Sequence, residues 1–306
     1  MGKKELSEKI SKLAGEKNAA ILAHNYQRPE IQQIADYLGD SLGLARQSSK
    51  LDTELIVFAG VDFMAETAAL LNPGKKVVIP DLEAQCPMAS QLPAKTVQKA
   101  KKEHPDAAVV LYVNTLAEAR AEANVTCTSA NSVQVVNALA EDVILFGPDS
   151  NLAWHVKQNT DKEIIPIPKN GHCYVHKMFS ATDIELLIED FPKAEVLVHP
   201  ESDPEVQKLA DYICSTSQML RRAQESPADE FIIATEIGLV HRLNRELPNR
   251  KFIPALSDGI CQQMKLHTLD KIYRALINEE PVVEVPSDIA DRARAATERM
   301  FEVSKG

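Results

Sequence analysis

The sequence predicts an α/β fold of three similar α/β/α units with short parallel sheets, arranged around a pseudo-threefold axis with an active site at the centre. Two observations carry this prediction. Cysteines recur at intervals of 87 and 88 residues, at Cys86, Cys173 and Cys261. Apolar runs recur at intervals of 88 residues, beginning at Leu55, Val143 and Phe231. A period this long is typical of a repeated domain rather than of a solenoid.

Each unit begins with an apolar, β-rich run, at residues 19–22, 108–113 and 196–198. Strands alternate with helices along each unit, which predicts parallel sheets with crossover helices. Signals for a helix start at Pro29 and at Asp203-Pro204 predict a helix of about ten residues after the first strand, followed by a short turn. We divide the chain into residues 1–105 with an N-terminal helix, 106–193, and 194–306 with the C-terminal helices.

Composition excludes several classes of protein. The chain has 306 residues and a net charge of −10, and no lysine- or arginine-rich run points to nucleic acid. No apolar run reaches the roughly 18 residues of a membrane helix. Five cysteines without a CxxC pair argue against a secreted disulfide framework. We therefore expect a cytoplasmic protein.

Polar side chains follow the first strand of each unit, where parallel sheets bind ligands. The residues that end these apolar runs are His24, Tyr112 and His199. A hydroxyl residue follows each of them 17 positions later, as Ser41, Ser129 and Thr216. Such hydroxyls are either caps of the next helix or part of an anion pocket at a helix start. Their equivalent positions in three units favour the pocket.

The repeated cysteines indicate a metal site, whereas Cys127 and Cys214 fit a buried packing role. Structural zinc sites usually have compact ligand pairs, which this spacing lacks. A 4Fe–4S cluster accepts distant thiolates, and three of them leave one iron free to act as a Lewis acid. His172 and His176 are alternative fourth ligands. An iron–sulfur hydro-lyase acting on one hydroxy acid, an iron–sulfur carrier and a zinc protein stay open as rival functions.

Several stretches together resemble the quinolinate synthase family, the A protein of de novo NAD biosynthesis. They include AHNYQRPEIQQIADYLGD (23–40), QCPMA (85–89), GHCYVHKMF (171–179) and VHPESDPEV (198–206). The resemblance covers nearly the whole chain. It implies three similar α/β domains in a triangle around a 4Fe–4S cluster, held by the residues that match Cys86, Cys173 and Cys261. It also implies condensation of iminoaspartate with dihydroxyacetone phosphate to quinolinate, phosphate and water.

The resemblance implies roles for the residues that the repeat selects. Substrate contacts fall on His24, Ser41, Tyr112, Asn114, Ser129, His199, Glu201 and Thr216. Glu201 is expected to transfer protons, with a pKa that rises if it is buried away from cations, and His24 and Tyr26 are further catalytic candidates. Some members carry a CxxCxxC run at the third ligand, but Ala255 and Asp258 occupy those positions here. A separate aspartate oxidase or dehydrogenase is expected to supply iminoaspartate.

Overall fold

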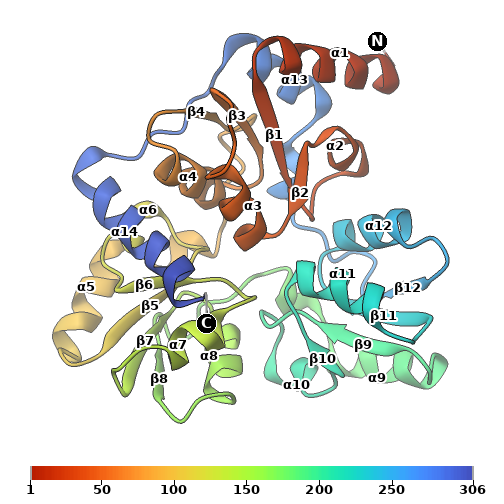
Figure 1. The fold of residues 1–306 in the computed structure, drawn as a ribbon. Coiled ribbons are helices and arrows are strands. Elements are labelled where there is room, and N and C mark those ends of the chain that lie inside the picture. Colours follow the sequence, from red (N-terminus) through yellow and green to blue (C-terminus); the bar gives the residue numbers. More distant parts are fainter. Residues whose placement is uncertain (1, 305–306) are drawn as a thin grey trace.

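Three four-stranded sheets organise the chain, and the computed structural model describes residues 2–304 (Figure 1). The strands of the first sheet are β1 (Ala19–His24), β2 (Tyr37–Gly39), β3 (Leu55–Ala59) and β4 (Lys76–Val78). Those of the second are β5 (Ala108–Tyr112), β6 (Val125–Cys127), β7 (Val143–Gly147) and β8 (Glu163–Pro166). Those of the third are β9 (Glu195–Val198), β10 (Tyr212–Ile213), β11 (Glu230–Ala234) and β12 (Lys251–Pro254).

The three sheets share one topology. In each, the second strand lies at one edge, followed by the first, third and fourth, and the paired strands run parallel. The central strands are almost wholly buried, as in β3, because helices cover both faces of each sheet. The predicted α/β fold of three similar units with parallel sheets is therefore confirmed.

Helices cover the sheets and link the units. Those up to the second cysteine loop are α1 (Lys3–Glu16), α2 (Pro29–Ile34), α3 (Ser41–Ser48), α4 (Asp62–Leu71), α5 (Ala94–Glu103), α6 (Ala117–Arg120), α7 (Ser132–Asn137) and α8 (Ser150–Lys157). The others are α9 (Ala181–Asp190), α10 (Pro204–Gln207), α11 (Thr216–Glu225), α12 (Ile237–Glu246), α13 (Leu269–Asn278) and α14 (Ser287–Val303). Among residues 2–304, none of them has the length and apolar character needed to cross a membrane.

The segment after the first strand of each unit differs from the prediction. The expected helix of about ten residues is only six residues long in α2 and four in α10. The rest of the segment forms a short edge strand, of three residues in β2 and two in β10, that pairs on one side only. Such short strands have too few residues to show an alternating pattern, so the sequence predicted a turn there.

The helix after each cysteine loop packs on the next sheet. Val97 of α5 belongs to the same buried apolar cluster as Val109 of β5, and Ile184 of α9 belongs to the same cluster as Val196 of β9. Ile272 of α13 completes the series by packing with Ile10 of α1 and the first sheet. The division of the chain at 105/106 and 193/194 stays a prediction. Each of these helices lies within one predicted unit and packs on the sheet of another.

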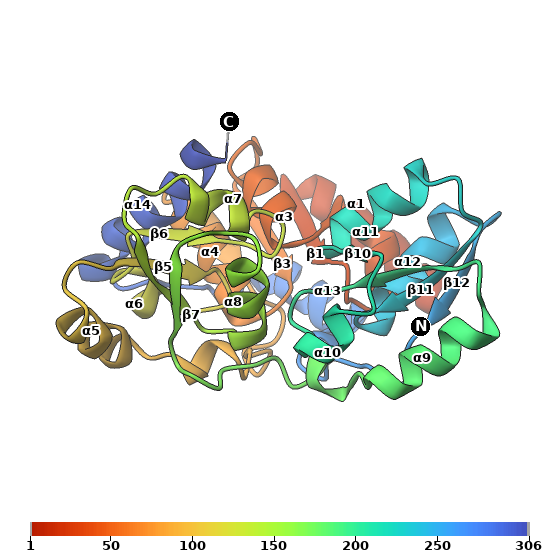
Figure 2. The ribbon, with the colours of Figure 1, turned by 90° about the horizontal axis from the view of Figure 1, so that it is seen from below.

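The last helix, α14, lies between two units. It contacts α4 of the first unit and both α6 and β6 of the second. Met300 joins the large apolar core that the first two units share. Seen from below, the three units form a layer that is wider than it is deep (Figure 2). The carboxyl ends of the first strands meet near the centre of this layer.

Candidate active site and thiol centre

A cavity lies where the three units meet, and side chains from all three units line it. Every side chain that the sequence selected as a site residue lines it. These residues are His24, Tyr26, Ser41, Cys86, Tyr112, Asn114, Ser129, Cys173, His199, Glu201, Thr216 and Cys261. The structure thus brings all of them together, although they are spread over 238 positions of the sequence. Their individual roles stay predictions.

The ends of the first strands deliver the polar groups. His24 and Tyr112 are the last residues of β1 and β5, and His199 follows β9 directly. Two positions further along come Tyr26, Asn114 and Glu201, one from each unit. Parallel strands end at the same edge of a sheet, and these edges of the three sheets face one cavity, since the equivalent residues of all three units line it.

The hydroxyl residues are not the caps of their helices. Asp40 caps α3 by accepting a hydrogen bond from the Gly43 N–H at 2.8 Å, and Ser215 caps α11 through Gln218. Ser41 and Thr216 are instead the first residues of these helices, and both line the cavity. Since neighbours satisfy the helix starts, these hydroxyls are free to serve as ligand donors.

Each cysteine loop is held by a carboxylate that the sequence analysis missed. The N–H groups of the three cysteines donate to Asp62 at 2.9 Å, Asp149 at 3.2 Å and Glu236 at 3.2 Å, respectively. Each acid also accepts an N–H from the first turn of the helix that begins at Asp62 itself or just after Asp149 and Glu236. The three acids lie 87 residues apart in sequence. That spacing was the signal that could have found them.

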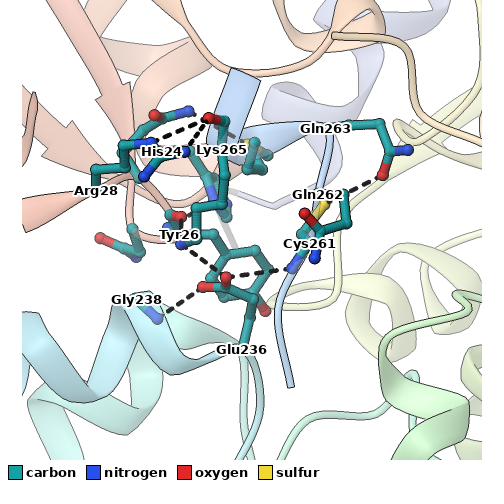
Figure 3. Close-up of polar contacts among 12 residues, drawn as sticks. His24, Tyr26, Arg28, Glu236, Gly238, Cys261, Gln262, Gln263 and Lys265 are labelled. Carbon is teal, nitrogen blue, oxygen red and sulfur yellow. Dashed lines mark hydrogen bonds and ion pairs between the residues drawn. The ribbon is translucent and has the colours of Figure 1, made fainter. Parts of the chain in front are cut away.

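Glu236, the third of these carboxylates, forms an ion pair with Lys265, which also contacts the first unit (Figure 3). Lys265 Nζ lies 2.7 Å from Glu236 Oε1 and also donates to the main-chain carbonyl of Tyr26. The Lys265 carbonyl in turn accepts two hydrogen bonds from Arg28, at 2.8 and 3.0 Å. The loop that carries Cys261 is therefore joined to the loop that carries Tyr26.

The thiols form no disulfide with any residue of the described chain. Burial raises the pKa of Cys86 and Cys173, and it raises the pKa of Cys261 to about 11. In the metal-free protein the thiols are therefore protonated at neutral pH, and binding of a metal would release their protons. Three soft sulfur donors that line one cavity fit an iron–sulfur cluster held by three thiolates.

Glu201 is a buried carboxylate that lines the cavity, as is Asp40, which caps α3. Its Oε1 accepts a hydrogen bond from the Tyr112 hydroxyl at 2.7 Å and a longer one from the Asn114 amide at 3.4 Å. Its Oε2 lies 2.8 Å from His176 Nδ1 and 3.8 Å from His199 Nδ1. Both oxygens are therefore surrounded by groups that stabilise the ionised form.

The neighbours of Glu201 reverse the expected direction of its pKa. Burial alone would raise the pKa of Glu201, but the adjacent His199 and His176 rings and the Tyr112 hydroxyl lower it. The expectation of a raised pKa assumed a carboxylate without such partners. Burial also lowers the pKa of His24 to about 4 and that of His199 to about 3. At neutral pH these two rings are therefore uncharged.

The two histidines that flank Cys173 lie in different places. His172 does not line the cavity, and its Nδ1 lies 2.9 Å from the Asn170 carbonyl oxygen. His176 is fully buried, lines the cavity and stacks on His199 with ring centroids 4.5 Å apart. Ligand atoms of Cys173, His176 and Glu201 lie within 4.8 Å of one another, a spacing that suits a metal ion. Of the two alternatives for a fourth ligand, only His176 is placed for it.

Parallel strands that bring thiols, imidazoles and carboxylates to one cavity are characteristic of an α/β enzyme, and comparisons with known proteins agree. The family model described as quinolinate synthetase A protein matches residues 8–302. The chain is 59% identical over 302 residues to the quinolinate synthase of Methanothermobacter thermautotrophicus, covering 98% of this chain and 99% of that protein.

Two further relatives extend this similarity. The quinolinate synthase of Thermococcus onnurineus is 53% identical over 304 residues, covering 99% of this chain and all of that protein. That of Methanocaldococcus jannaschii is 50% identical over 304 residues, covering 98% and 99%. The chain belongs to the quinolinate synthetase A family of enzymes, and the resemblance expected from its motifs is confirmed.

Proposed function

We propose that this chain is a quinolinate synthase of de novo NAD biosynthesis. It condenses iminoaspartate with dihydroxyacetone phosphate and closes the pyridine ring, releasing one phosphate and two waters. The observation that carries the proposal is the convergence of all the selected side chains on one cavity, in a chain of this family. A cytoplasmic location, where thiols stay reduced, is part of the proposal.

Cys86, Cys173 and Cys261 would hold a 4Fe–4S cluster. Their thiols line the same cavity, and each loop is fixed by a carboxylate on its cysteine N–H. When bound by three thiolates, such a cluster keeps one iron as a Lewis acid that helps a hydroxyl group to leave. The remaining chemistry falls to the side chains of the chain itself.

Neutral donors bind the carboxylates and the phosphate. Among residues 2–304, the groups that line the cavity include neither lysine nor arginine. Ser41 and Thr216 lie at helix starts, where N–H groups and the helix dipole favour anions. Thr216 is oriented by the Asn25 amide, which donates to its oxygen at 2.7 Å. Ser129, Asn114 and the uncharged rings of His24 and His199 supply further polar contacts.

Glu201 carries the proton transfers of triose isomerisation and dehydration. Its lowered pKa keeps the carboxylate ionised at neutral pH, so it acts first as a base. Tyr112 holds Oε1, so the carboxylate is fixed in the cavity rather than free to rotate. Burial raises the pKa of Tyr26, so its hydroxyl keeps its proton and can donate it. A separate aspartate oxidase or dehydrogenase supplies the unstable iminoaspartate.

The test is product formation by anaerobically purified, iron-loaded protein. Iminoaspartate is generated by an added aspartate oxidase, and dihydroxyacetone phosphate is supplied separately. We expect quinolinate and phosphate in equal amounts, none when either substrate is omitted, and four irons with four sulfides per chain. Turnover of a lone hydroxy acid would favour a hydro-lyase, and zinc in place of iron would overturn the cluster.

A further inference from the structure

Three side chains form a hydrogen-bonded chain that ends at the cavity. Arg242 Nη1 donates to Asn25 Oδ1, and Asn25 Nδ2 donates to Thr216 Oγ1 at 2.7 Å. Arg242 of α12 and Thr216 of α11 belong to the third unit, whereas the fully buried Asn25 belongs to the first. Thr216 lines the cavity, and the other two lie outside the set of residues that do so. The chain therefore connects a cation to the cavity through a neutral amide.

The chemistry of these groups sets the direction of the chain. A guanidinium group has only donors, so the Asn25 oxygen faces Arg242 and its NH₂ group faces Thr216. The Thr216 oxygen accepts a hydrogen from this amide, so its own hydrogen is available for donation into the cavity. Hydrogen bonds in a buried chain polarise one another, so the charge of Arg242 makes the Thr216 hydroxyl a stronger donor.

Arg242 is held in a fixed place, and its charge is felt at the cavity. Its Nε donates to Glu246 Oε1 at 2.8 Å, and its Nη1 also donates to the Leu38 carbonyl at 3.2 Å. Burial is the main cause of the lowered pKa of His24, and the positive charges of Lys265 and Arg242 act in the same direction. His24 lines the cavity, so the charge of Arg242 acts on groups there although its side chain does not reach them.

The repeat shows that the fold does not require this chain. The position of the amide directly follows the first strand's last polar residue, and the position of the cation lies six residues after the loop carboxylate. The other two units have Val113 and Pro200 at the first position, and Ala68 and His155 at the second. An amide paired with a guanidinium group is therefore specific to the helix start that carries Thr216.

Among residues 2–304, those that line the cavity include no lysine or arginine, yet the proposed substrate is a dicarboxylate. We propose that Arg242 and Asn25 are positioning residues that make the Thr216 hydroxyl an oriented, polarised donor to a substrate carboxylate. This inference rests on the proposed function, because the carboxylate is one that iminoaspartate brings and quinolinate keeps. A cation behind a neutral amide supplies positive potential to that carboxylate without occupying the cavity.

Binding of quinolinate to the iron-loaded protein, measured by anaerobic calorimetry, tests the role of the cation. Arg242→Met removes the charge and the donor but keeps a long side chain, and we expect Kd to rise by roughly tenfold to hundredfold. Arg242→Lys keeps a charge and a donor and should keep Kd within about threefold. Arg221→Met removes an exposed charge from α11, the helix of Thr216, and should leave Kd unchanged.

Asn25→Asp tests the direction of the chain independently. The new carboxylate has no hydrogen to donate, so Thr216 must donate its own hydrogen to it and keeps none for the ligand. We expect Kd for quinolinate to rise at least tenfold. Iron content and visible spectrum should match the parent in every variant, since no thiol is changed.

Unchanged affinity in either Arg242→Met or Asn25→Asp would overturn the inference. Equal losses in Arg242→Met and Arg242→Lys would also overturn it, because the effect would then come from packing rather than from the charge. The parent protein separates this failure from that of the proposed function. A parent that neither binds nor makes quinolinate would overturn the proposed function and the inference together, whereas equal binding by the parent and the variants would overturn the inference alone.

Discussion

The three cysteine loops and the three strand-end loops belong to the same repeat, yet they differ in how strictly they repeat. Every cysteine loop has a thiol and a carboxylate on the cysteine N–H. The strand-end loops place Tyr26, Asn114 and Glu201 at one equivalent position. The cysteine loops are the repeated part of the site, and they build a centre with threefold character. The strand-end loops are its varied part, and they make the surroundings of that centre asymmetric. A substrate with distinct ends needs that asymmetry.

The largest expected effect tests the repeated part. Alanine at Cys86, Cys173 or Cys261 should abolish the 4Fe–4S absorbance after anaerobic reconstitution, because each thiol is one of three ligands. Alanine at the buried Cys127 or Cys214 should leave the iron content normal. The measurement is iron, sulfide and the visible spectrum. A full cluster in any of the three loop variants would show that the repeated cysteines are not the ligand set.

The second prediction tests the varied part. Glu201→Gln should keep the cluster spectrum and lower quinolinate formation by roughly a hundredfold or more, because the amide cannot accept a proton. Glu205→Gln, at an exposed position of α10 nearby, is the matched control and should keep full activity. The measurement is the steady-state rate with both substrates. Turnover within tenfold of the parent would remove Glu201 from its acid–base role.

The third prediction concerns the strand-end loops. Their buried histidines should lower the free energy of unfolding at acidic pH. Burial lowers the pKa of His24 to about 4, so the unfolded chain binds more protons than the folded one between about pH 6.5 and pH 4. The stability contributed by the neutral ring is present above pH 6.5 and is lost as the pH falls through this window. The loss is roughly 3 kcal/mol for this ring.

Denaturant unfolding of the iron-free protein across pH 4 to 8 measures this loss. His24→Gln cannot be protonated and should flatten the dependence, whereas His104→Gln, outside the cavity, should leave its slope unchanged. His199, whose pKa burial lowers to about 3, should behave as His24 does. Equal pH dependence in the parent and in His24→Gln would show that the ring is not held neutral by the fold.

The smallest expected effect is a difference in stability between variants of the carboxylates that hold the cysteine loops. Asp149 uses one oxygen for the Leu152 N–H and the other for the Cys173 N–H. Asp62 uses Oδ1 for both the Phe63 and the Cys86 N–H. Asparagine has a single acceptor oxygen, so Asp149→Asn leaves one buried N–H without a partner and should cost about 1–3 kcal/mol.

Asp62→Asn keeps its shared acceptor and is therefore the matched control, with an expected cost below about 1 kcal/mol. The measurement is the unfolding midpoint of the two iron-free variants. Equal midpoints would mean that the carboxylates hold the loops by charge rather than by the number of their acceptor oxygens.

The sequence predicted the repeat and the parallel sheets, and every side chain that it selected lines the cavity, because strand ends and loop cysteines keep a strict spacing. It did not predict β2 or β10, whose two or three residues carry no pattern. It also missed Asp62, Asp149 and Glu236, since an acid before a helix is usually only a cap. The sequence offered His176 as a ligand but not its contacts with Glu201 and His199 of another unit, because no local pattern records contacts between units.

The helices α5, α9 and α13 each follow a cysteine loop and pack on the sheet of the next unit, and this arrangement has a mechanical consequence. Each cysteine loop connects the unit it leaves to the unit on which its following helix packs. Rotation of one unit against its neighbour must therefore displace a sulfur atom. The positions of the three sulfurs therefore depend on the angles between the units. A change in those angles alters the ligand geometry at the centre, and a change in that geometry alters the angles.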